Sequence, residues 1–179
     1  GLGSGAVDSI TTGDNNTGVG VSALTGTTDG SDNVALGQGT LVANTSGTAN
    51  VAIGRETMAS NTTANDNTAV GRGAMNSNTT GANNTSIGRS SMVSNTTSAA
   101  NTAVGKEALD ANTTADNNTS IGAYSLSANT TGSGNTAVGQ EALNDNTTAS
   151  NNTAVGNACL DVNTTGADNV AIGASAMGA

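Results

Sequence analysis

The chain has 179 residues, and Gly, Ala, Asn, Thr and Ser dominate its composition, whereas Tyr124 is the single aromatic residue and Phe, Trp, Pro and His are absent. Four bases against thirteen acids give a net charge of −9, which argues against nucleic acid and against an anionic membrane surface as partners. No apolar run is long enough to cross a bilayer, so we expect no direct membrane insertion in this segment.

One phrase, Asn-Thr-Ala-Val-Gly at residues 101–105, returns every 17 residues without insertion or deletion, and its glycine column has eleven members. A strict period of this length is typical of a solenoid, in which each repeat stacks on the one before it. We therefore predict a single all-β domain over residues 1–179, a parallel β-solenoid of eleven 17-residue coils. Both ends fall in mid-repeat, which we interpret as part of a longer fibre.

The first two coils, residues 1–15 and 16–32, are degraded copies, and the pattern tightens from Asn50 onward. In the representative coil, residues 101–117, the short β-branched run from Thr102 to Val104 predicts one strand. Alternation places Thr102 and Val104 on one face of this strand and Ala103 on the other. Beyond the glycine, Ala108 and Leu109 are compatible with a second strand or with one helical turn, and residues 112–114 predict a strand end before a polar turn.

Two columns of each coil are always large and apolar: the residue before the glycine and the fourth residue after it. We predict that they form the core: Val70, Ile87, Val104, Ile121, Val138 and Val155, with Met75, Met92, Leu109, Leu126, Leu143 and Leu160. The column of Ala103 holds only small residues, which a solvent-exposed face does not explain. We predict that it packs against a neighbouring chain through Ala69, Ser86, Ala103, Ser120, Ala137 and Ala154.

The glycine column predicts a turn that needs positive φ or a close backbone approach, at Gly71, Gly88, Gly105, Gly122, Gly139 and Gly156. Two asparagine columns predict side-chain amide ladders, because stacked coils lie about 4.8 Å apart. The first ladder comprises Asn67, Asn84, Asn101, Asn118, Asn135 and Asn152, and the second comprises Asn78, Asn95, Asn112, Asn129, Asn146 and Asn163.

No catalytic constellation is visible, because the chain has no His and no pair of carboxylates at a persuasive spacing. We therefore expect no enzyme activity, no cofactor and no metal, and we interpret Cys159 as a small buried filler in a column of Ala, Ser and Thr. Four bases follow the glycine in successive coils: Arg55, Arg72, Arg89 and Lys106. They are either a solvated corner partly paired with acids such as Glu56 and Glu107, or a contact for a surface receptor or a polysaccharide.

The phrase Asn-Val-Ala-Ile-Gly, at residues 50–54 and 169–173, resembles the head repeat of YadA-like trimeric autotransporter adhesins. The longer form that continues to Asn-Thr-Thr-Gly resembles repeats in tail-fibre-like proteins of marine phages and environmental bacteria, although the adhesin heads use a shorter coil. The resemblance implies a left-handed β-roll and a side-by-side homotrimer in an extracellular fibre on a cell surface or a virion.

A core of two large side chains per coil is thin, so we expect association with identical chains. The leading hypothesis for function is a structural and adhesive fibre segment, from a bacterial adhesin or a phage tail fibre, that attaches to a host or surface through a rigid rod. Two alternatives stay open. One is a self-assembling extracellular filament, and the other is an ice-binding solenoid that uses threonine ranks from Thr62-Thr63 to Thr164-Thr165.

Overall fold

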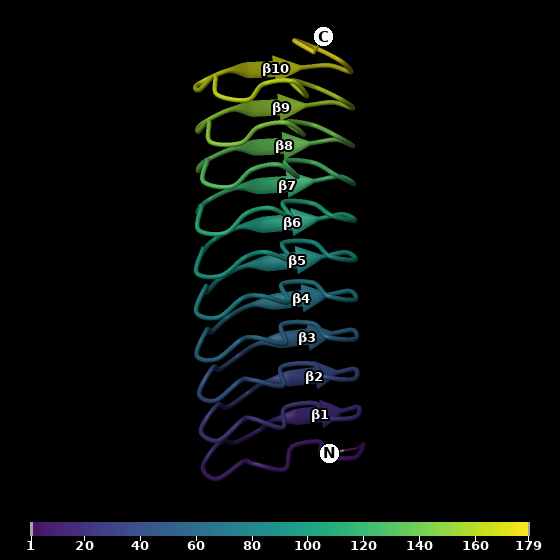
Figure 1. Cartoon of the computed structure of the whole chain (residues 1–179), viewed down its shortest axis with the longest axis vertical. Helices are drawn as coiled ribbons and strands as arrows, with labels where there is room; N and C mark the ends of the chain where they lie inside the picture. The colour runs from purple at the N-terminus through teal and green to yellow at the C-terminus, as the bar shows by residue number, and fades with distance from the viewer. Residues whose placement is uncertain (1, 179) are drawn as a thin grey trace.

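The computed structural model describes residues 2–178, which form a straight, rod-shaped parallel β-solenoid (Figure 1). Its strands stack in chain order into one ten-stranded parallel sheet. The strands are β1 (Thr17–Val19), β2 (Val34–Leu36), β3 (Val51–Ile53), β4 (Thr68–Val70), β5 (Thr85–Ile87), β6 (Thr102–Val104), β7 (Thr119–Ile121), β8 (Thr136–Val138), β9 (Thr153–Val155) and β10 (Val170–Ile172). The first copy of the phrase contributes an isolated bridge from Leu2 to Val19.

Every strand pairs with its neighbour at a shift of one repeat, so each residue lies beside the residue of its own column. In β6, for example, Ala103 is in register with Ser86 on one side and with Ser120 on the other. The predicted parallel solenoid with a 17-residue repeat is therefore confirmed. Ten strands at the usual spacing of about 4.8 Å make the rod about 50 Å long.

The interior of each coil is lined by the Ala103 column, not by the Val104 column. The predicted alternation is correct, but the assignment of its two faces is wrong. Residues Ala69, Ser86, Ala103, Ser120, Ala137 and Ala154 are all fully buried within the single chain, so they are not a surface for another chain. The aliphatic column turns outward instead, and it includes Val70, Ile87, Val104, Ile121, Val138 and Val155, of which Ile87 and Ile121 are 40% exposed.

This inversion has a steric reason, since each coil has room for one large interior side chain. The Leu109 column supplies it: Met75, Met92, Leu109, Leu126, Leu143 and Leu160 are buried, as predicted. A small residue must therefore lie opposite. At Gly18, which belongs to the Ala103 column, an added Cβ would lie 2.5 Å from the Val7 Cγ2 and 3.5 Å from the Leu24 Cδ1.

The segment from Lys106 to Ala111 is neither a strand nor a helical turn but a run of turns that brings the Leu109 side chain inward. Its backbone passes through the left-handed region at Glu107 (φ 54°) and again at Leu109 (φ 55°). The Leu109 N–H then donates to the Ser125 carbonyl of the next coil, at 3.0 Å. These inter-coil bonds maintain a backbone conformation that side chains other than glycine rarely adopt.

The glycine column has both predicted properties. Gly105 has φ 144°, and a Cβ at this position would lie 2.4 Å from the Gly122 carbonyl oxygen of the coil that follows. The same holds along the rod for Gly71, Gly88, Gly122, Gly139 and Gly156, each of which has positive φ and lies against the glycine carbonyl of the next coil. No side chain can be accommodated there without separating the coils.

Both asparagine ladders are present. In the first ladder, the backbone N–H of Asn101 donates to the Asn84 Oδ1 (3.0 Å), and the Asn101 Nδ2 donates to the Ala115 carbonyl of its own coil (3.0 Å). In the second ladder, the Asn112 Nδ2 donates to the Asn95 Oδ1 (3.4 Å) and to the same Ala115 carbonyl (3.1 Å). The amides therefore bond coil to coil and also satisfy the carbonyl of the polar turn.

Candidate functional site

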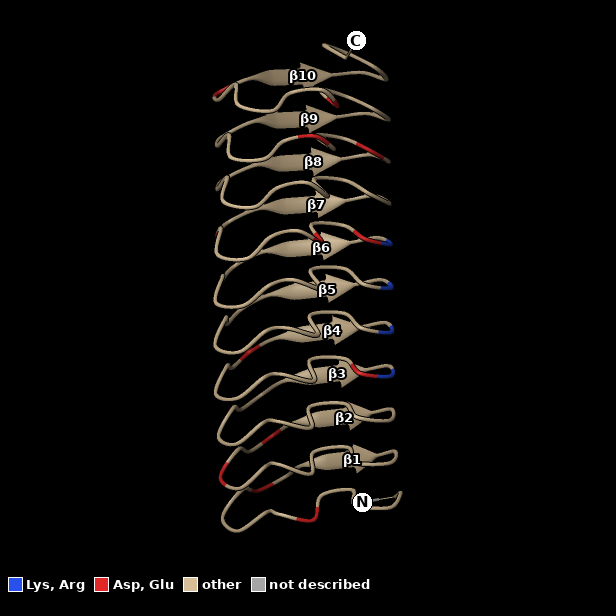
Figure 2. Ribbon diagram, in the orientation of Figure 1, with Lys and Arg blue, Asp and Glu red and all other residues tan. Residues whose placement is uncertain are grey.

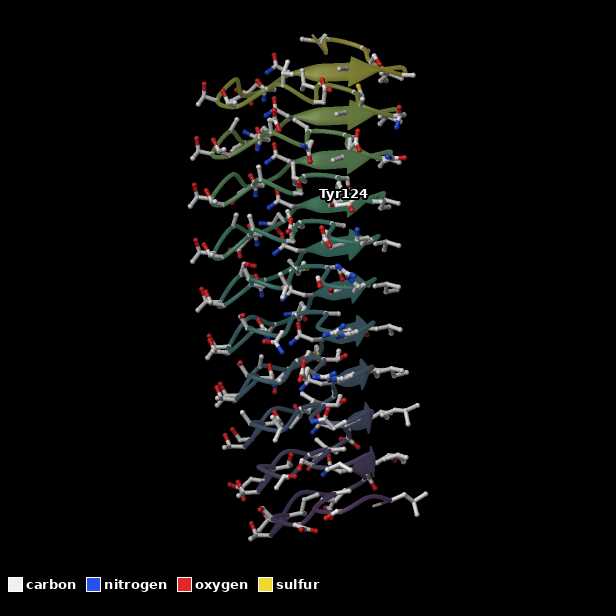
Figure 3. All side chains as sticks on the ribbon, turned by 45° about the vertical axis from the view of Figure 1, so that its right-hand side comes forward. Tyr124 is labelled. Atoms are coloured by element: carbon white, nitrogen blue, oxygen red, sulfur yellow. The ribbon has the colours of Figure 1, made fainter. Side chains whose placement is uncertain are left out.

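The first candidate surface is the outer face of the ten-stranded sheet, which we call the outer sheet face. It consists of the Thr102 column and the Val104 column, two outward residues from each strand, and side chains of one column follow one another along the rod (Figure 3). The strands carry no charged residue. The aliphatic column runs unbroken from β1 to β10, and its most exposed members are Leu36 (47%) and Ile172 (73%).

Sequence reasoning missed this surface because it assigned the Val104 column to the core. Two pairs of serines in the sequence indicate the correct assignment of the two faces. The two coils with Ser in the Ala103 column, at Ser86 and Ser120, also have Ser five residues later, at Ser91 and Ser125. In the structure each pair is buried and hydrogen-bonded across the coil, which requires the Ala103 column to face inward.

The second candidate surface is a corner directly after strands β3 to β6, where all four bases of the chain lie in consecutive coils (Figure 2). We call Arg55, Arg72, Arg89 and Lys106 the basic corner. Three of them lie close to acids: Arg55 to Glu56 (2.9 Å), and Arg89 and Lys106 to Glu107 (3.1 and 3.7 Å). Arg72 has no ion pair with any residue between 2 and 178. The corner is thus partly paired, as one interpretation predicts, and retains an excess of positive charge.

At one end of the basic corner, Lys106 lies over the ring of Tyr124, with its Nζ 4.6 Å from the ring centroid. The Lys106 ammonium also donates a hydrogen bond to the Tyr124 hydroxyl. This bond raises the pKa of Lys106 above its ordinary value, and the nearby Glu107 carboxylate adds to the increase, against the opposing effects of desolvation and of Arg89. The ammonium therefore stays charged at neutral pH.

A hollow of about 310 Å³ opens in the middle of the basic corner, lined by Glu56, Arg72, Gly73, Asn76, Arg89, Ser90 and Val93. The hollow exists because Gly73 has no side chain, whereas Glu56 occupies the same position in the preceding coil. The Asn76 Nδ2 donates to the Glu56 carbonyl (2.9 Å), which fixes this amide at the hollow. Two guanidinium groups therefore border a space of small-ligand size.

The threonine ranks do not form the flat double array that the ice-binding alternative requires of them. Thr62 is half-buried, and its hydroxyl donates to the Thr79 carbonyl of the next coil at 3.1 Å. Thr63 is exposed at the corner. On the outer sheet face, the Thr102 column holds threonine in β1 and from β4 to β9, and valine in β2, β3 and β10.

Cys159 is buried, and its thiol lies 3.3 Å from the Ala171 carbonyl. Within residues 2–178, no group of three or more Cys, Asp or Glu side chains could hold a metal ion. The same residues contain no helix that is long and apolar enough to cross a membrane. Neither a protein-family model, nor a curated protein, nor a solved structure matches the chain.

Proposed function

We propose that this chain is a rod-like segment of an extracellular adhesive fibre, in which identical chains pack side by side through the outer sheet face. Three chains per fibre, and a setting on a cell surface or a virion, follow from the resemblance to trimeric adhesin heads and tail fibres. The rod supplies stiffness and repeated contacts rather than a catalytic pocket.

The outer sheet face is the observation that supports this proposal. Ten strands about 4.8 Å apart, each with two outward side chains over about 10 Å, give an uncharged area on the order of 500 Å². The aliphatic column makes up about half of this width, so it is an unbroken apolar strip on the order of 200 Å², and apolar strips of this size are often functional surfaces. A second copy of the chain offers a surface of the same length, period and chemistry, which makes it the best-matched occupant.

The experiment is a native mass by light scattering on a size-exclusion column, with two double variants. We expect three chains per particle for the unaltered protein. Ile87→Glu with Ile121→Glu should give single chains with an unchanged circular dichroism spectrum, because both side chains lie outside the core. The control, Thr80→Glu with Thr114→Glu, adds the same charge at the exposed threonine corner and should leave the mass unchanged.

A single-chain mass for the unaltered protein would overturn the proposal, and so would a three-chain mass for Ile87→Glu with Ile121→Glu. Particles of indefinite length would favour the self-assembling filament instead.

A second candidate function, ice binding, is favoured by the Thr102 column on the same flat face. In the six strands from β4 to β9 its hydroxyls recur about 4.8 Å apart, beside an aliphatic column about 7 Å away. A monomer that shapes ice crystals and shows thermal hysteresis, with loss of both on Thr102→Glu, would support this candidate. Absence of thermal hysteresis would exclude it.

A further inference from the structure

The basic corner concentrates the positive charge of an otherwise acidic rod. The chain has thirteen acids and four bases, and the four bases occupy one column in four successive coils. Their two nearest carboxylates, Glu56 and Glu107, leave a local excess of cations. A polyanion is therefore attracted to this corner and repelled by the acids elsewhere on the surface.

The side chains of the basic corner are available to solvent. Those of Arg55, Arg89 and Lys106 are 55%, 60% and 44% exposed. Arg72, with no ion pair among the described residues, borders the hollow together with Arg89. A guanidinium presents a planar fork of donors that matches the two oxygens of a carboxylate, so both arginines can bind such a group directly.

The hollow adds features that suit a sugar. The hollow, about 310 Å³, offers the Asn76 amide and the Ser90 hydroxyl beside the Val93 side chain, a mixture of polar and apolar groups that matches a pyranose ring. Tyr124, the only aromatic residue of the chain, lies at the end of the corner, where Lys106 lies over its ring and is held beside the site.

The spacing of the charges favours a linear polymer. One base per coil means one cation about every 4.8 Å along the rod axis, which is comparable to the length of one sugar residue. A polyuronate carries one carboxylate on each sugar residue, so several carboxylates can face several bases at once. A nucleic acid fits less well, because the bases form a single column and the acids of the chain, including Glu56 and Glu107 beside the bases, repel a broad polyanion.

We infer that the basic corner binds an acidic polysaccharide of the polyuronate type, laid along the rod with a sugar residue in the hollow beside Gly73. This inference rests on the adhesive part of the proposed function and specifies its ligand class.

The sharpest test fills the hollow and leaves every base in place. Gly73 has φ 68° in a column where Glu56 and Glu107 adopt the same left-handed backbone, so Gly73→Glu is compatible with the fold. Its carboxylate would occupy the hollow between two arginines. The matched control is Ala158→Glu, in the same column with φ 47° and with the same change in net charge, but five coils away from Gly73.

Binding of an oligomannuronate is measured by isothermal titration calorimetry with the full chain, and neutral dextran and an oligothymidylate serve as comparison ligands. We expect oligomannuronate binding that weakens with added salt, no dextran binding, and weaker oligothymidylate binding. Gly73→Glu should weaken oligomannuronate binding about tenfold, and Ala158→Glu should not change it. Equal affinities for the two variants, no binding by the unaltered chain, or tighter binding of oligothymidylate would each overturn the inference.

A second variant pair tests the arginines. Arg72→Gln with Arg89→Gln should weaken oligomannuronate binding at least about tenfold, because two charge-assisted contacts are lost. Asn65→Asp with Asn117→Asp produces the same net charge at exposed positions outside the basic corner, in columns that already hold Asp116 and Asp66. This control should retain the affinity, and a loss equal to that of the arginine variant would contradict a local site.

The two proposals fail separately. If the protein forms a three-chain particle that does not bind oligomannuronate, the fibre proposal stands and the polysaccharide inference is wrong. If the protein is a single chain that binds oligomannuronate through the hollow, the fibre proposal is wrong and the polysaccharide inference stands.

Discussion

Individual residues in this chain are constrained mainly by the coil above and the coil below. Gly105 illustrates this, since the nearest obstacle to a side chain is a carbonyl oxygen one repeat later. Leu109 illustrates it from the core, because its left-handed backbone directs the N–H to the following coil. A substitution is therefore judged by its fit to the stack as much as by its fit to its own coil.

Gly105→Ala should destabilise the rod by several kcal/mol, because its Cβ would lie 2.4 Å from the Gly122 carbonyl oxygen and force two coils apart. Gly173→Ala is the matched control, with a similar φ of 127° and its nearest heavy atom at 3.8 Å. It should cost only the backbone strain, about 1–3 kcal/mol. Urea unfolding followed by circular dichroism measures both, and equal losses would show that stacking is not the constraint.

Asp110 should make the fold less stable as pH rises through its titration. Partial burial raises the pKa of this carboxyl above its ordinary value of 3.8, with a smaller contribution from Glu107, against the lowering effect of backbone hydrogen bonds. A raised carboxyl pKa means that the folded state binds the proton more tightly than the unfolded chain does. Ionisation therefore costs stability at neutral pH, and the cost disappears as pH falls below the ordinary value.

Asp110→Asn should consequently stabilise the protein at pH 7 by about 0.5–1 kcal/mol and have little effect near pH 3. Asn76, in the same column, shows that the amide fits and can donate to a carbonyl of the preceding coil. The measurement is the difference in unfolding free energy between variant and parent across this pH range. A difference that stays constant with pH would rule out the titration of Asp110 as its cause.

Each coil combines one short strand with a long series of turns, and buried polar groups recur among its interior contacts. Asparagine ladders run along the polar side of the coil, and serine pairs replace alanine pairs in two coils. A buried hydroxyl needs a hydrogen-bond partner, and the structure supplies it in two ways. The paired serines bond each other, whereas Thr40 and Thr57 donate to the Gly54 and Gly71 carbonyls of the next coil.

The serine pair Ser86–Ser91 should therefore show coupling in a double-mutant cycle. Ser86→Ala and Ser91→Ala should each cost about 0.5–1.5 kcal/mol. The double variant should cost less than the sum by about 0.5–1 kcal/mol, because it recreates the alanine pair found at Ala103 and Ala108. Thermal or urea unfolding gives the four free energies, and strict additivity would contradict a direct contact across the core.

The whole molecule is a one-dimensional stack of coils, and every coil has the same length of 17 residues. Contacts between strands run only between neighbours in chain order, so stability should be close to a sum over coils and their interfaces. The outer sheet face exists only at this scale. No single strand is long enough to form an interface, but ten of them in register make a continuous uncharged surface.

Deletion of residues 135–151, which is one complete repeat, should leave a folded rod with a melting temperature lowered by only a few degrees. Deletion of residues 136–151, one residue fewer, should be far more damaging. Every later column would then be shifted by one position, which places the glycines beneath side chains and turns the Ala103 column outward. Circular dichroism melting compares the two, and similar melting temperatures would contradict the strict stacking register.

The sequence by itself determined the solenoid, its period, the glycine turns and the asparagine ladders. Each depends on residues that repeat at the same position, and stacking of identical positions follows from the period alone. It also placed Thr102 and Val104 on one side of the strand, because alternation is a local property of extended backbone.

Only the tertiary structure decided which side of the strand is the inside. Ala103 and Val104 are both apolar, so hydrophobicity does not distinguish their faces. The decision depends on what lies across the coil, where the turns at Glu107 and Leu109 bring one large side chain inward and leave room for a methyl group opposite. The tertiary structure also decided the hollow beside Gly73. The side chain missing at this position leaves a hollow because of the way in which the side chains of neighbouring coils surround it, and the sequence alone does not show that arrangement.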